Sequence, residues 1–183
     1  MANTPLQNDL NIIVRAFVAL ATGLDRKCVI PGNDNGPAPT VPYASVLDIT
    51  KQGDGIDSEV ARPGSVPEEA KLFVSGRRNI VYSVQFYKDC AADNAESLLQ
   101  FAATTPGQIF LGENGLTWRR AGEVRNLDSV MGSKFEVRRS VDIEFRFQSK
   151  TEIDVLTIGS VEIDLTLSAG SDLTENIEVT EDA

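Results

Sequence analysis

Histidine and cysteine, two residue types that many enzymes use for catalysis, are absent or scarce in this sequence of 183 residues. It contains no histidine, and its only cysteines are Cys28 and Cys90. Zinc sites built from cysteine and histidine are therefore excluded, as are nucleophiles that a histidine base would activate. We expect two reduced thiols rather than a disulfide, because nothing else in the sequence indicates secretion.

The glycine-rich turn at residues 32–36 is the nearest approach to a phosphate-binding loop. It lacks the following Lys-Ser/Thr pair and the helix that would hold a phosphate. As a calcium loop it would place Pro31 and Pro42 at ligand positions, and proline has no side-chain oxygen. Since no other enzyme motif is present, the sequence predicts no catalytic residue, no cofactor and no metal site, and we expect a protein that is not an enzyme.

Acidic residues form two groups that could do chemistry. We expect the three acids between residues 54 and 59 to lie in a solvated loop rather than to hold a cation. Asp142 and Glu144 share one strand face with Arg138 and Arg146 because alternate residues of a strand point the same way. We interpret them as cross-strand charge pairs on a solvated face. Spacing alone does not exclude the paired carboxylates of a glycoside hydrolase.

The formal net charge of -10 is concentrated in the C-terminal part of the sequence. Residues 151–183 carry nine of the 27 acids and no Lys or Arg, which leaves 18 acids against 17 bases in the first 150 residues. This balance gives no general affinity for nucleic acid, whose phosphates need cationic partners. We interpret the Arg-Arg doublets at residues 77–78, 119–120 and 138–139 as solvated strand faces or salt-bridge partners.

A helix is predicted from about Pro5 to Thr22. Residues 4–7 have the form of a capping box with Pro5 at the first helical position, and Gly23 ends the helix. Apolar residues cover most of its circumference, so more than one side must be covered, in part by a neighbouring subunit.

The apolar run at residues 12–24 is interrupted by Arg15 and is shorter than the roughly 20 residues that cross a bilayer. No basic segment precedes it. We therefore expect neither a signal peptide nor a membrane anchor.

Proline and glycine concentrate in residues 31–42 and 53–67, which are predicted to be long irregular loops that contact partners. A strand at residues 43–50 is expected between them.

A strand-to-helix step gives the clearest local signal. Residues 79–88 alternate as a strand, and Asp89 is expected to cap a helix over residues 90–104 that Pro106-Gly107 ends. A further strand is predicted at residues 116–124.

A long hairpin is predicted near the C-terminal end. Residues 135–147 alternate as a strand of about 43 Å, against the usual 17–20 Å, so the strand should extend past its own domain. A turn at residues 149–152 leads to a second strand at 153–167. A long unpaired strand edge can pair with a strand of an identical copy. Repeating this pairing from copy to copy would form a ring.

These elements predict an α+β fold, a two-layer sandwich in which a mostly antiparallel sheet with a long C-terminal β-hairpin packs against two helices. No internal repeat or second core is visible. We expect a single ring-forming domain over residues 1–167 and an acidic, flexible tail over residues 168–183. The alternative is a tail that docks onto a neighbouring copy.

The sequence resembles the phage neck and tail-terminator proteins. The resemblance rests on residues 84–89 (VQFYKD), the helix that follows with Ala91 and Leu98, and residues 122–127 (GEVRNL). It continues through residues 135–147 and weakly through 158–163, so that it covers roughly residues 9–165. The order of strand, helix and hairpin carries it rather than any catalytic motif, and the acidic extension after about Leu167 departs from the family pattern.

The resemblance implies a virion structural protein of the neck, assembled in the host cytoplasm. Such a protein forms a homohexameric ring around the DNA channel, caps the tail tube and joins it to the head-proximal connector. The implied partners are further copies of the chain, the tail tube protein and the connector protein. DNA passes through without specific binding, and no membrane is involved.

Apolar residues of the first helix and of the long hairpin are the candidate subunit contacts. They are Ile13, Phe17, Leu20, Phe135, Val137, Phe145 and Phe147.

Two other hypotheses stay open at this point. The chain could serve another phage assembly role on a related sandwich, such as a tube protein, a head-completion stopper or a tail-completion factor. It could also be an unrecognised enzyme or small-molecule binding domain, because a fold does not fix a function.

Overall fold

The computed structural model describes residues 7–33, 36–63, 69–131 and 134–156. This part of the chain forms two compact units. Unit 1 takes in the described residues up to Asp57 and those of Ser75–Lys150, and unit 2 those of Ser58–Val74 and from Thr151 onward. The predicted capping box, most of the predicted second hairpin strand and the predicted tail at 168–183 lie outside the described residues.

Helix α1 (Gln7–Thr22) opens unit 1 and buries one side completely. Leu10, Val14, Phe17 and Val18 recur at the spacing that places side chains on one helical face, and none is exposed. The helix ends as predicted, because Gly23 takes a φ of 72° and donates its N–H to the Ala19 carbonyl at 2.9 Å. A short 3-10 helix, η1 (Arg26–Cys28), follows.

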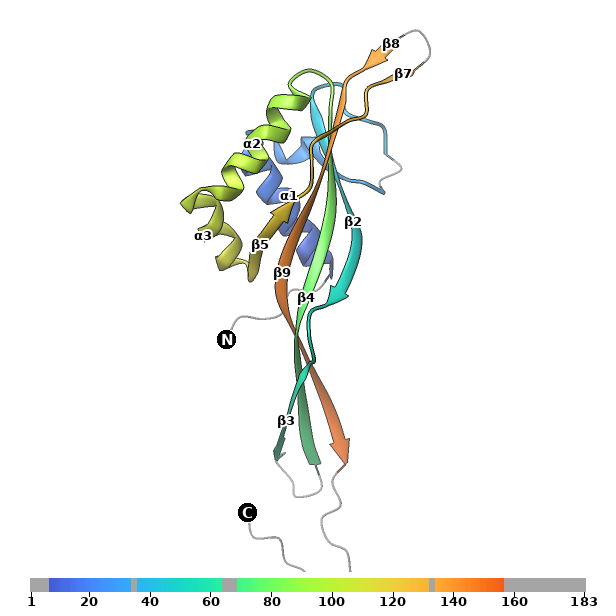
Figure 1. Ribbon diagram of the computed structural model, residues 1–183. Helices are drawn as coiled ribbons and strands as arrows, with labels where there is room; N and C mark the ends of the chain where they lie inside the picture. Colours follow the sequence, from blue (N-terminus) through green and yellow to red (C-terminus); the bar gives the residue numbers. More distant parts are fainter. Residues whose placement is uncertain (1–6, 34–35, 64–68, 132–133, 157–183) are drawn as a thin grey trace, which may run out of the picture. The chain divides into compact units, whose positions relative to one another are not determined.

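The sheet of unit 1 has the strand order β1-β2-β4-β9-β5, with β6 also paired to β9. Figure 1 shows β2, β4, β9 and β5 side by side in this order. Its strands are β1 (Val29–Pro31), β2 (Tyr43–Gly53), β4 (Glu69–Tyr87), β5 (Leu116–Ala121), β6 (Arg125–Asn126) and β9 (Arg138–Leu156). The β2–β4, β5–β9 and β6–β9 pairs are antiparallel, and β1–β2 is parallel. Strands β4 and β9 each contribute residues to both units.

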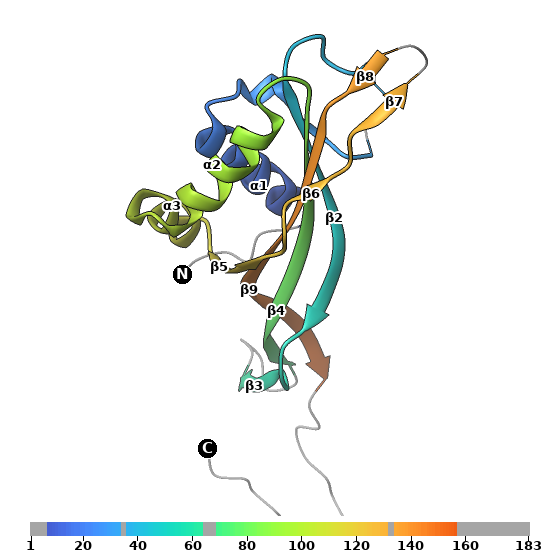
Figure 2. The ribbon, with the colours of Figure 1, turned by 45° about the horizontal axis from the view of Figure 1, so that its top comes forward.

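Helices α2 (Ala91–Ala103) and α3 (Thr105–Glu113) lie with α1 on one side of this sheet, as both ribbon views show (Figures 1 and 2). Alternate residues of β4 and β9 face the helices and are fully or almost fully buried: Ile80, Tyr82, Val84, Phe86, Val141, Ile143, Phe145 and Phe147. Phe17 packs against Phe101, Phe110, Trp118 and Phe145, with ring centroids 5.5 to 6.3 Å apart. One aromatic side chain of α1 therefore joins α2, α3, β5 and β9.

Two smaller features complete the described chain. Strands β7 (Ser129–Met131) and β8 (Lys134–Glu136) form a two-stranded sheet of their own. In unit 2, strand β3 (Ser58–Pro63) pairs with β4, and a 2.5 Å ion pair between Lys71 and Glu152 links β4 to β9.

The predicted α+β class, with helices packed on a mostly antiparallel sheet, is confirmed. Several details were wrong. Strand β9 continues through residues 149–152, where a turn was predicted, and Pro106-Gly107, predicted to end helical structure, lies in the first turn of a third helix, α3. Residues 58–63, predicted to be irregular, form β3.

The start of α2 also differs from the prediction. Cys90, not Asp89, occupies the N-cap position, with a φ of 64° and no side-chain capping bond. The sharp left-handed turn at Lys88 and Cys90 replaces the expected Asp89 cap.

Candidate subunit-contact surfaces

The described residues hold no group of three or more His, Cys, Asp or Glu side chains that could bind a metal ion. Cys28 and Cys90 are free thiols. The charged face of the sheet and the exposed apolar side chains are the remaining candidates for function.

A network of arginines and carboxylates covers the sheet face of unit 1 that points away from the helices. Glu144 on β9 is buried, and Arg120 on β5 donates Nε–H to it at 2.5 Å. Arg119 approaches the other oxygen of Glu144, with its Nε at 3.6 Å. Asp142 pairs with Arg125 of β6 at 2.5 Å.

The cross-strand charge pairs predicted for Asp142 and Glu144 are therefore present, but with other partners. They pair with arginines of β5 and β6, because these strands lie beside β9 in the sheet. Glu144 is also buried rather than solvated. Arg138 instead donates to Gln85, and Arg146 pairs with Asp54.

The acids between residues 54 and 59 include two carboxylates that arginines bind, which the prediction of a solvated loop did not anticipate. Asp54 is shared between Arg146 and Arg119. Asp57 accepts two hydrogen bonds from the Arg78 guanidinium, at 2.6 and 2.5 Å. These hydrogen bonds hold the pKa of Asp57 below its usual value.

An aromatic stack with a cation at each end occupies the far end of the same sheet face. Tyr43 and Tyr87 stack with centroids 4.4 Å apart and planes 4° from parallel. Lys88 lies 5.7 Å from the Tyr43 ring centre, and Arg138 lies 5.2 Å from that of Tyr87. Such cation–π contacts fix the direction of flexible basic side chains. Burial is the main cause that raises the pKa of Tyr43.

Asp128 holds the base of the β7–β8 hairpin against β9. Its Oδ1 accepts the backbone N–H of Arg138 at 2.8 Å and also pairs with the Arg139 guanidinium. The Leu127 N–H donates to the Arg138 carbonyl at 2.9 Å. The backbone hydrogen bond, followed by the Arg139 contact, lowers the pKa of Asp128.

Because the pKa of Asp128 is lower in the folded chain, its contribution to stability is complete above the ordinary, unfolded-state value of 3.8 and is lost as the pH falls through the folded-state value. We expect an NMR titration of the Asp128 carboxyl carbon to show a midpoint below 3.8. The Arg139→Ala variant should raise that midpoint only part of the way to the ordinary aspartate value, since the hydrogen bond from the Arg138 N–H remains. A wild-type midpoint at or above 3.8 would contradict this assignment.

Three of the seven predicted contact residues lie in the core of the subunit. Phe17 and Phe145 are fully buried, and Phe147 is 3% exposed. They offer a sister copy almost no surface, because the chain's own helices and strands already cover them. Ile13 and Val137 are half-buried and pack against the same core.

Leu20 and Phe135 are the predicted contact residues that the structure leaves open to solvent, at 55% and 66% exposure. Phe135 lies opposite Val130 in the β7–β8 pair, and Val130 is 70% exposed. An isolated two-stranded hairpin has little stability of its own. A partner that covers the exposed Val130–Phe135 pair would therefore stabilise the β7–β8 hairpin.

Unit 2 contains a further apolar surface, which the sequence pattern did not reveal. None of its described side chains is buried, although Val60, Leu72, Phe73, Val74 and Ile153 are apolar. Arg62 lies over the Phe73 ring at 5.1 Å and gives it partial cover. No helix occurs among the described residues of this unit. A small sheet without a covering layer is not expected to be stable alone.

A fold of this kind, with structural ion pairs and uncovered apolar strands, fits a protein that functions in an assembly. The family model described as phage neck terminator protein matches residues 8–170. This chain belongs to the phage neck terminator family. A search of proteins with curated descriptions found no match.

A neck terminator is a structural component of the phage virion, so this protein's partners are other phage head or tail proteins. The match extends to residue 170, so the last 13 of the 183 residues lie outside it. No helix in the described chain is long and apolar enough to span a bilayer.

Proposed function

We propose that this neck terminator forms a closed homohexameric ring that caps the tail tube and joins it to the head-proximal connector. It assembles in the host cytoplasm and has no enzymatic activity. Membership of the neck terminator family supports this proposal, and the described residues add surfaces that only partners would cover.

The ring proposal rests on one observation. None of the side chains described in unit 2 is buried. Folding a three-stranded arrangement costs conformational entropy that buried apolar area must offset. Val60 is 52% exposed and Ile153 44% exposed in the single chain. Sister copies around a ring would supply the missing cover.

A ring also needs two different surfaces on each copy, since head-to-tail contacts close only when unlike patches meet. Leu20 on α1 and Phe135 on β8 are exposed apolar side chains on separate elements of unit 1. We propose both as subunit contacts, with the half-buried Ile13 and Val137 beside them.

DNA passes through such a ring without specific binding. Four of the six arginines in the three Arg-Arg doublets pair with acids, which reduces the positive charge that phosphates could meet. Each phosphate contact would add salt-sensitive affinity and slow the passage of DNA.

Mass measurement of the purified protein in native buffer tests the ring. We expect a closed species of six copies, and a monomer at high concentration would contradict the proposal. Electron microscopy of the protein mixed with tail tubes should then show it at tube ends only. Coating along the length would instead assign it as a tube protein.

Charge substitution at the proposed contacts is expected to break the ring. Leu20→Asp and Phe135→Asp should each shift the hexamer to smaller species, because each places an unpaired charge in an apolar contact. Ala92→Asp is the control, since Ala92 is exposed in the first turn of α2, where an acid is favourable. Hexamers that persist in both variants would exclude these residues from the interface.

A further inference from the structure

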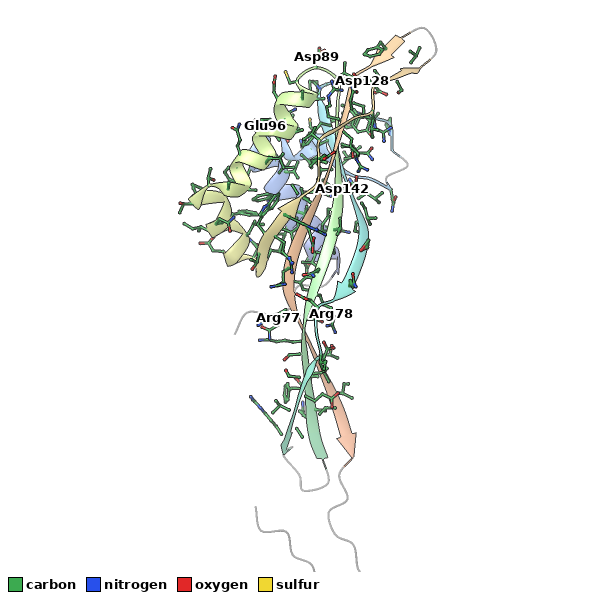
Figure 3. The ribbon with its side chains drawn as sticks, viewed as in Figure 1. Arg77, Arg78, Asp89, Glu96, Asp128 and Asp142 are labelled. Atoms are coloured by element: carbon green, nitrogen blue, oxygen red, sulfur yellow. The ribbon has the colours of Figure 1, made fainter. Side chains whose placement is uncertain are left out.

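The β7–β8 hairpin presents apolar side chains that its own copy does not cover. Val130 and Phe135 lie directly opposite each other, so both side chains point to the same face of the hairpin, where they are 70% and 66% exposed. Both ribbon views show the hairpin at the end of the sheet, away from α2 and α3 (Figures 1 and 2). Figure 3 labels Asp128 at the base of the hairpin. Since Asp128 ties this base to β9 through Arg138 and Arg139, the apolar pair is held in a fixed position.

A pocket of about 300 Å³ lies between α1, the end of β1 and the middle of β2, all in unit 1. Apolar side chains form part of its wall: Ile12, Pro31, Val46 and Leu47. We call this site the α1 pocket. Its size suits the exposed pair of the hairpin, because a cavity of about 150 Å³ holds a single benzene ring. The α1 pocket therefore has room for the Phe135 ring together with the smaller Val130 side chain.

Two polar side chains of the α1 pocket have hydrogen-bond partners within the subunit. The Asn11 Oδ1 accepts a hydrogen bond from the Tyr82 hydroxyl at 2.9 Å. The Arg15 Nε–H donates to the Val29 carbonyl at 2.8 Å. An apolar side chain can therefore enter the pocket without breaking either bond. A guanidinium also attracts the face of an aromatic ring, so Arg15 favours phenylalanine as the entering side chain.

A second copy of the chain is the partner that fits both surfaces. Each copy carries one hairpin and one α1 pocket, and these surfaces are unlike, as head-to-tail contacts around a closed ring require. Within one copy the hairpin does not fill the pocket, because Val130 and Phe135 are both open to solvent. Ile12 at the pocket is 58% exposed as well. Hairpin and pocket thus each leave apolar surface that the other would remove from water.

We propose that Val130 and Phe135 of one copy insert into the α1 pocket of the next copy. This inference rests on the proposed ring and identifies the surface that receives Phe135. Repeated from copy to copy, the contact closes the ring and leaves no hairpin and no pocket without a partner.

Photocrosslinking of the assembled protein tests this pairing. The photoreactive residue p-benzoylphenylalanine replaces Phe135 and keeps an aromatic ring at that position. In rings that mix isotopically light and heavy copies, mass spectrometry should map crosslinks from position 135 of one copy to Ile12 or Leu47 of another. The matched control carries the same photoreactive residue in place of Ile109, which is 55% exposed on α3 and lies outside the α1 pocket. The control should give no crosslink to the pocket.

A double-mutant cycle provides a second measurement without a bulky probe. Ile12→Ala and Phe135→Ala should each raise the protein concentration at which the ring dissociates, as followed by native mass measurement. Combined in one chain, their effect should be several-fold smaller than the product of the two single effects, because each substitution removes the same contact. Both side chains are exposed, so neither truncation should unfold the subunit. In the control cycle, the effects of Ile109→Ala and Phe135→Ala should multiply.

The outcomes separate the pocket from the ring. Hexamers in which position 135 crosslinks elsewhere on the sister copy, or in which the two truncations act independently, would overturn the pocket assignment and leave the ring intact. Crosslinks to added tail tubes instead would assign the hairpin to the tube protein. A chain that stays monomeric would overturn the ring and, with it, this contact.

Discussion

Replacing Phe17 with alanine is expected to lower the free energy of unfolding by about 3–5 kcal/mol, the usual cost of removing a buried aromatic ring. Phe17 has no exposed surface and contacts aromatic rings of α2, α3, β5 and β9. Its loss leaves a cavity where these elements meet, and no single neighbour can move to fill it. Denaturant unfolding at matched protein concentrations measures the change, since assembly adds to apparent stability.

Leu20→Ala on the same helix is the control for Phe17→Ala. Leu20 is 55% exposed, so its truncation should change the stability of the separated subunit by less than about 0.5 kcal/mol. If Leu20 is a subunit contact, the ring formed by the Leu20→Ala variant should dissociate at a higher protein concentration than the wild-type ring. A loss below about 1 kcal/mol for Phe17→Ala would contradict its place at the centre of the core.

The contrast between Phe17 and Leu20 shows what the apolar pattern of α1 could and could not predict. Three or four apolar residues per two turns predict a buried helical face, and the sequence correctly indicated a helix ending at Gly23. The pattern does not tell whether a side chain is covered by the chain's own strands or by another subunit. Phe17 and Leu20 therefore looked alike in the sequence, although only Phe17 is buried in the subunit.

The sequence pattern did not predict the full length of β4, because Gly76 and the Arg77-Arg78 doublet lie within the strand. A glycine followed by two charged residues breaks the alternation that marks a strand, so the strand was predicted to begin only at residue 79. In the structure, a Cβ at position 76 would lie 1.8 Å from Asp57 Oδ1. Glycine is needed there because the Asp57–Arg78 ion pair occupies the space beside the strand, and this long-range contact leaves no local signal.

The partners of Asp142 and Glu144 were hidden for a similar reason. Alternation along β9 correctly placed both acids on one face, away from Val141 and Ile143. Which arginine each acid meets depends on strand order, and β9 lies between β4 and β5. Strand order arises from contacts between distant segments, so no spacing within the sequence of β9 encodes it.

Replacing Gly107 with alanine is expected to destabilise the subunit by about 1–3 kcal/mol, the usual cost of overpacking. A Cβ at this position would lie 2.2 Å from the Phe101 carbonyl oxygen, a backbone atom at the end of α2 that cannot rotate away. Alanine favours helices over glycine by only about 1 kcal/mol, which does not offset the clash. The Pro106-Gly107 pair thus lets α3 start directly against α2 rather than ending helical structure, with Thr104 accepting the Gly107 N–H at 3.3 Å.

Gly112→Ala provides a matched control in the same helix. A Cβ at position 112 would meet no atom within 4 Å, so alanine there should stabilise the subunit by a few tenths of a kcal/mol up to about 1. Thermal unfolding of the two variants should therefore move the midpoint in opposite directions. If both substitutions raised it, α3 would not pack tightly against the end of α2. The Phe110 ring of α3 would then not cover Phe17 in the core.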